Sequence, residues 1–241
     1  MKKKIMGVAL VVALVAIMVG GTLAYFTAED EVTNTFTIGS VKIEIYENDA
    51  PTESDTVEFD KPFVPVVNMT EPSKDESYIK KEVNVKNTGN NAAYIRTHIA
   101  IPTALVGYLY LDLDETGWTR QQPDTTATVE NVAYTVFTYN YNAELAPDYT
   151  TSKLLKGVYL GSDVDLKDNP DTPATEDLEF CIRNQDGSYT YSGFAAYTGS
   201  GSAIQGINVL VASEAIQAEG FSDAATALTS GFGNATNPWQ P

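Results

Sequence analysis

Apolar and polar residues alternate along most of the chain with a period of two. Val41, Ile43 and Ile45 alternate with polar side chains, and segment 78–86 repeats the pattern except at Lys81, where a lysine falls in an apolar position. This alternation is typical of strands that bury one face and expose the other. The sequence therefore predicts half-buried strands in both segments.

An Asn- and Gly-rich segment, 87–92, follows the second of these strands. Because Asn and Gly tolerate left-handed backbone angles, this composition predicts a hairpin turn that joins the strand to a partner over 93–101. Alternation in the partner places its isoleucines toward the core and directs Arg96 and His98 outward.

Further short strands are predicted over 129–141, 157–160, 178–183, 188–191 and 206–213. Helix signals cover only 103–111 and 223–228, and Ser222 is the expected N-cap of the second helix. Segments 48–65 and 161–177 are acidic, contain proline and are typical of long surface loops. Many short strands separated by turn residues favour an all-β fold, an antiparallel β-sandwich or jelly roll with few short helices.

The first 25 residues depart from this pattern. Three lysines at positions 2–4 precede an apolar run over 5–19, and small residues follow it. This order predicts a secretory signal peptide, because the apolar run is short for a membrane span, which needs about 20 residues. The small residues Thr22 and Ala24 suit cleavage after Ala24.

Four parts of the sequence carry a family resemblance. The junction GGTLAYFT (20–27) resembles the signal-peptide junction of the TasA/camelysin (CalY) family, which consists of exported biofilm-matrix fibre proteins of Gram-positive bacteria. Segments 36–45, 78–102 and 207–221 resemble the family's first strand, its paired strands around an Asn-Thr-Gly turn, and its closing strand. The resemblance implies a jelly-roll-like β-sandwich domain over 37–241.

The resemblance also implies how the N-terminus is processed. A dedicated signal peptidase would cut beside Phe26, which makes residues 1–25 the signal peptide and Tyr25 the last residue removed. The general rule instead places the cut after Ala24, and both positions stay open. Either cut predicts a secreted protein of the extracellular matrix or cell surface, with no stable membrane span after processing.

The segment 26–36 is polar, short and close to the new N-terminus, so it needs a partner edge in order to pack as a strand. In the family that it resembles, this segment is a donor strand that adds to the sheet of the next subunit. Phe26, Val32 and Phe36 would then set the register. Because such head-to-tail contacts do not close, they build fibres. The partners implied are further copies of the chain, the signal peptidase and a fibre accessory protein.

Composition narrows the choice of partners and chemistry. Removing the signal peptide leaves 12 of the 15 basic residues against 32 acidic ones, which argues against nucleic acid and anionic lipid as partners. The single cysteine, Cys181, excludes an intramolecular disulfide. Strand alternation places Cys181 on the face opposite Phe180, as an incidental thiol.

Catalytic motifs are missing from the sequence. His98 is the only histidine, so the two-histidine zinc motif cannot be written, and neither a Gly-x-Ser-x-Gly elbow nor a phosphate-binding loop occurs. His98 is predicted to be a plain exposed side chain, and the chain is predicted not to be an enzyme. A camelysin-like secreted metal-dependent protease is the alternative that the resemblance keeps open.

Two surface features suggest ligands. Asp163, Asp165, Asp168 and Asp171 could start a calcium cage, but Lys167 occupies a ligand position of an EF-type loop, and acidic loops are usually just solvated. No other cofactor is expected. A further alternative is a carbohydrate-binding or adhesive sandwich, whose sugar-stacking face would be drawn from a group of tyrosines. Aromatic residues also fill sandwich cores, and a core position is the favoured interpretation of these tyrosines. They are Tyr108, Tyr110, Tyr134, Tyr139 and Tyr141.

Overall fold

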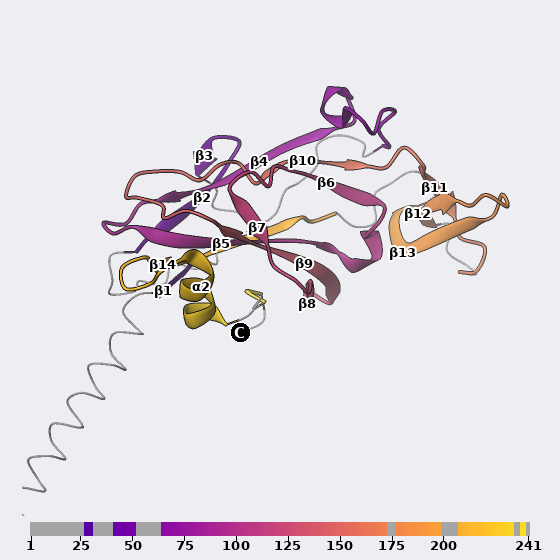
Figure 1. The fold of residues 1–241 in the computed structure, drawn as a ribbon. Coiled ribbons are helices and arrows are strands. Elements are labelled where there is room, and N and C mark those ends of the chain that lie inside the picture. The colour runs from indigo at the N-terminus through magenta and orange to yellow at the C-terminus, as the bar shows by residue number, and fades with distance from the viewer. Residues whose placement is uncertain are drawn as a thin grey trace, which may run out of the picture.

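Apolar faces of two antiparallel sheets pack against each other in the computed structural model, which describes residues 27–30, 41–51, 64–172, 177–198, 207–233 and 237–239. A third, smaller sheet lies at one end of this pair, and the helix α2 (Ala224–Phe232) lies beside one of the large sheets (Figure 1). The fold is mostly β, and its antiparallel sheets fit a β-sandwich, as the sequence predicts.

The first sheet, sheet A, has six strands, with β1, β14, β5, β9 and β7 in spatial order and β8 also paired with β9. The strands are β1 (Thr27–Asp30), β14 (Leu210–Gln217), β5 (Ala93–Pro102), β9 (Val132–Tyr141), β7 (Trp118–Arg120) and β8 (Thr125–Val129). Every pairing in the sheet is antiparallel.

The second sheet, sheet B, has five strands in the order β3, β2, β4, β10 and β6, and sheet C has three in the order β11, β12 and β13. Sheet B consists of β3 (Ala50–Pro51), β2 (Ile43–Glu47), β4 (Ile79–Asn87), β10 (Leu155–Leu160) and β6 (Leu109–Leu113). Sheet C consists of β11 (Val164–Asp168), β12 (Asp177–Arg183) and β13 (Tyr189–Thr198). Two 3-10 turns, η1 (Pro72–Lys74) and η2 (Thr103–Leu105), complete the described elements.

The main core lies between sheets A and B and extends to sheet C. Alternate residues of β2, β4 and β5 point into it, including Ile45, Val85 and Ile95. Lys81 also points inward, as its position in the pattern indicates, and is 2% exposed. Its Nζ lies 3.0 Å from Glu47 Oε2, so the buried ammonium has a charged partner. Burial still lowers the pKa of Lys81.

The predicted hairpin between β4 and β5 is wrong, because β4 belongs to sheet B and β5 to sheet A. The connection is an arch that carries the chain from one sheet to the other. Asn87 holds it: its buried side chain donates to the carbonyls of Asn91 and Leu145 at 2.8 Å each and accepts from the Gly89 amide at 2.9 Å. Both strands bury an apolar face in the same core, β4 from sheet B and β5 from sheet A.

The predicted helix over 103–111 is also wrong beyond its first turn. Only η2 is helical, and β6 follows because its leucines alternate and pair with β10. The predicted strand over 129–141 is divided at Glu130 and Asn131, whose positive φ angles of 49° and 69° turn β8 into β9.

Two smaller boundaries differ from the prediction. The loop predicted over 161–177 contains β11. The helix predicted over 223–228 is present as α2, but Asp223 caps it in place of Ser222, because the Asp223 carboxylate accepts from the Thr226 amide at 2.8 Å.

Candidate functional site

The edge of sheet A is formed by β1, which lies inside the candidate donor segment 26–36. One side of β14 pairs with β5 over its full length, and the other side pairs with β1 over four residues, from Thr27 opposite Ile216 to Asp30 opposite Ser213. In this structure residues 27–30 of the segment therefore occupy an edge of their own sheet. The side chains expected to set its register, Phe26, Val32 and Phe36, and the cleavage residues Ala24 and Tyr25 lie outside the described residues.

The register of this edge places two acidic residues opposite each other, Glu29 on β1 and Glu214 on β14. The same row continues with Arg96 on β5 and Asn140 on β9. Directly opposed residues of antiparallel strands share a face of the sheet, so Glu214, Arg96 and Asn140 form a polar row across three neighbouring strands.

The outer face of sheet A buries a cluster of polar side chains where the sequence predicts exposure. His98 is 0% exposed, Arg96 1% and Glu214 3%, so the prediction that Arg96 and His98 face solvent is wrong. The physical reason is the C-terminal part of the chain: α2 packs on this face through Leu228 and Phe232, and the Trp239 ring lies edge-on to His98 at 6.4 Å.

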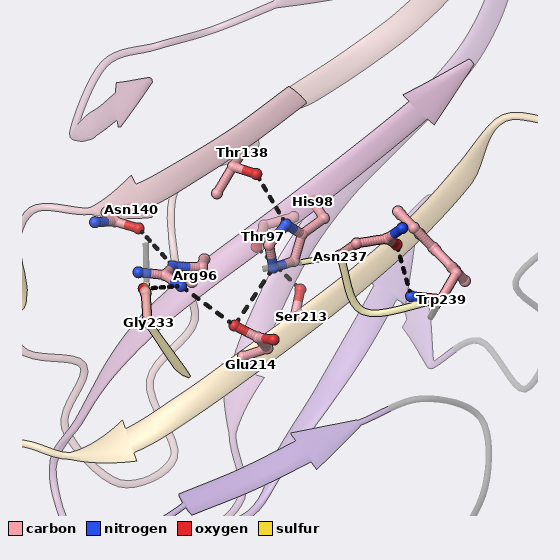
Figure 2. A network of polar contacts seen from close by, with 10 residues as sticks. All are labelled: Arg96, Thr97, His98, Thr138, Asn140, Ser213, Glu214, Gly233, Asn237 and Trp239. Atoms are coloured by element: carbon pink, nitrogen blue, oxygen red, sulfur yellow. Dashed lines mark hydrogen bonds and ion pairs between the residues drawn. The ribbon is translucent and has the colours of Figure 1, made fainter. Parts of the chain in front are cut away.

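Figure 2 shows how the cluster is connected across β5, β9 and β14. Arg96 donates through Nε to Asn140 Oδ1 and through Nη1 to the Gly233 carbonyl, at 3.1 Å each, and Nη1 lies 3.7 Å from Glu214 Oε2. Burial lowers the pKa of Arg96, and the Glu214 carboxylate opposes that shift. Arg96 thus fastens the C-terminal end of α2 to the sheet.

His98 bridges the same carboxylate and the neighbouring strand. Its Nδ1 lies 2.9 Å from Thr138 Oγ1, and its Nε2 lies 3.4 Å from Glu214 Oε2. Because the ring is fully buried, a substrate in solution has no access to it. The geometry fits a structural histidine and provides no Ser-His-Asp arrangement, since its two polar neighbours are a threonine and a glutamate.

The N-terminal part of the chain matches a family model described as camelysin metallo-endopeptidase, over residues 1–92. This part resembles the camelysin family. The match confirms the resemblance that the junction and the first strands carry, and it ends just before β5. No curated protein and no solved structure matches the chain.

The camelysin description implies a metal centre, and the described residues do not fit one. Among them, no three His, Cys, Asp or Glu side chains lie close enough together to hold a metal ion. The chain's single histidine lies in the buried cluster under α2.

Within the described ranges, no helix is long and apolar enough to cross a membrane.

The four aspartates of the calcium prediction lie on and around β11, and they are not gathered into such a group in the described part of the chain. Asp165 is paired with Lys167, 2.8 Å away, and this partner lowers the pKa of the Asp165 carboxyl. Asp163 precedes β11, Asp168 ends it, and the Asp171 amide donates to Asn169 Oδ1. Calcium binding by this loop stays a prediction.

Three of the five tyrosines considered for sugar stacking, Tyr108, Tyr134 and Tyr139, are buried in apolar clusters, as the core interpretation predicts. Tyr110 and Tyr141 are half-buried.

Cys181 is fully buried like its neighbour Phe180, because both faces of β12 are covered there. Burial raises the pKa of the Cys181 thiol.

Proposed function

We propose that this chain is an exported structural subunit of extracellular fibres that assembles head to tail through its N-terminal strand. The camelysin match supports this proposal because it includes the segment predicted to be the signal peptide and the segment that contains β1. The acidic composition suits a secreted, soluble subunit before assembly.

The pairing of β1 with β14 carries the proposal. It indicates that the segment has a strand conformation available and that the β14 edge accepts an antiparallel strand. In the described part of the chain four residues of this segment pair, and β1 has a neighbouring strand on one side. The same segment of another copy would form the same main-chain hydrogen bonds, so exchange between copies replaces an internal ladder with an equivalent external one. Because donor and acceptor surfaces differ, each subunit keeps one of each, and the assembly grows.

Processing would control this exchange. While the signal peptide remains attached, it extends the N-terminus beyond segment 26–36 and keeps the strand from entering a neighbour. N-terminal sequencing of the secreted protein is expected to begin at Tyr25 or Phe26. A start beyond Val32 would remove most of the donor segment and contradict the mechanism.

Electron microscopy of purified mature protein tests assembly. Deletion of residues 26–36 is expected to leave a folded monomer that forms no fibres, and Val32→Asp or Phe36→Asp to reduce fibre formation, because each places a charge on the docking segment. Val67→Asp is the matched control: Val67 lies outside this segment and is 89% exposed, so the same change there should leave fibres unaltered. Normal fibres from the deletion variant would exclude assembly through this segment.

The family description favours a metal-dependent endopeptidase as the second candidate. A casein digest with and without added zinc tests it directly. His98→Ala is expected to leave any proteolysis unchanged, because the side chain is buried and held by Thr138 and Glu214. Loss of a robust, chelator-sensitive activity in a folded His98→Ala protein would overturn the prediction that the chain is not an enzyme.

A further inference from the structure

Three tyrosine rings form a continuous row across the outer face of sheet B. Tyr78 precedes β4, Tyr159 lies on β10 and Tyr110 on β6. The ring centroids of Tyr78 and Tyr159 are 6.4 Å apart with an interplanar angle of 29°, and those of Tyr159 and Tyr110 are 5.6 Å apart at 14°. All three rings are half-buried, so each keeps part of its surface in contact with solvent.

Two glycines let these rings lie on the sheet. A Cβ placed on Gly157 of β10 would overlap the Tyr78 ring, and one placed on Gly161 would lie 2.9 Å from Tyr110 Cε2. Tyr78 therefore lies over the backbone of β10 and reaches β6, where its hydroxyl donates to Asp112 at 2.8 Å. A ring that rests on backbone in this way directs its other face outward, and the near-parallel neighbours extend that face over three strands.

The lysines around the row are paired with carboxylates, and Asp112 beside Tyr78 adds a negative charge to a chain that is strongly acidic as a whole. Lys80 pairs with Glu82 at 3.0 Å, and Lys156 pairs with Asp114 at 3.1 Å. A polyanion finds no excess of positive charge here. An uncharged partner with a flat apolar face and polar edges complements such a surface.

We propose that the row Tyr78, Tyr159 and Tyr110 binds a neutral polysaccharide. The C–H face of a pyranose ring is apolar and stacks on an aromatic face, while the sugar hydroxyls need hydrogen-bond partners at the ring edge. Lys80 and Asp112 lie opposite Gly157 on the two neighbouring strands, next to the Tyr78 hydroxyl, and would supply those partners. The row gives the subunit a site for a linear glycan that is independent of the β1–β14 edge.

Affinity electrophoresis of the purified protein in gels containing hydroxyethyl cellulose, β-glucan, galactomannan or starch tests this site. The wild-type protein is expected to be retarded by at least one of these glycans. Tyr159→Leu, which keeps apolar volume but removes the aromatic face, should reduce retardation at least fivefold, whereas Tyr159→Trp should preserve it. Tyr149→Ala is the matched control, because Tyr149 is 68% exposed and lies outside the row.

Circular dichroism spectra and melting curves of each variant would establish that it is folded, and Tyr110→Leu provides an independent second change within the row. Absence of retardation by all four glycans would overturn the proposal. Equal retardation of wild-type and folded Tyr159→Leu protein would overturn it too. Retardation only by the polyanions alginate or heparin, lost at high salt, would assign the face to charge instead of stacking.

Discussion

Replacing Arg96 by Met should be among the most damaging single changes in this protein. The guanidinium is 1% exposed, holds Asn140 Oδ1 and the Gly233 carbonyl at 3.1 Å each, and faces Glu214. Removing one partner of a buried ion pair typically costs about 3–5 kcal/mol, because the remaining buried charge loses the cation that faced it. The two acceptors left behind in Arg96→Met add to this cost. We therefore expect a loss of about 3–5 kcal/mol in the free energy of unfolding.

Urea unfolding, followed by far-ultraviolet circular dichroism, measures this loss. Adding Glu214→Gln to Arg96→Met removes the buried carboxylate charge that faced Arg96, so the double variant should recover stability and give a coupling energy above about 0.5 kcal/mol. Arg120→Met is the matched control: Arg120 forms a surface ion pair with Asp124 at 2.8 Å, and such pairs contribute about 0–1 kcal/mol. A loss below about 1 kcal/mol in Arg96→Met, or strictly additive effects in the double variant, would refute this account of the cluster.

Three further outcomes follow from individual contacts. Asp223→Ala should lower the melting temperature by a few degrees at pH 7. Because hydrogen bonds from Thr226 and Ser222 lower the Asp223 pKa, this difference is present above about pH 4 and should vanish as the pH falls through the lowered pKa. Persistence of the difference in acid would contradict the cap. Cys181 should resist thiol reagents until urea unfolds the protein, since the thiol is fully buried and its pKa is raised, and rapid labelling of folded protein would contradict that burial. Burial raises the pKa of Tyr139 to about 12, so ultraviolet titration should show a tyrosine that ionises well above pH 10 and is missing in Tyr139→Phe. The stabilising effect of the neutral Tyr139 side chain is complete below pH 10 and is lost as the pH rises through about 12. Uniform titration of all 14 tyrosines near pH 10 would disprove the raised pKa.

The local sequence pattern determined many of the strands and the apolar face that each of them buries. The alternation in β2 and β4 predicted which apolar side chains enter the core, whereas Lys81 was the exception to the pattern, and the structure buries it beside Glu47. Such features depend on neighbours one or two residues away, and the period of two records them directly. The family resemblance of the N-terminal part was likewise contained in a short stretch of sequence and agrees with the match over 1–92.

Only the tertiary structure decided which sheet each strand joins and what covers its second face. β4 and β5 are consecutive but lie in different sheets, since the Asn87 side chain stabilises an arch and not a hairpin. His98 and Arg96 alternate with apolar residues as exposed positions do, yet α2 and Trp239, more than 100 positions away in sequence, bury them. The tyrosine row likewise depends on the adjacency of β4, β10 and β6. Alternation distinguishes the two faces of a strand, but burial of the outer face depends on chain segments whose docking no local pattern records.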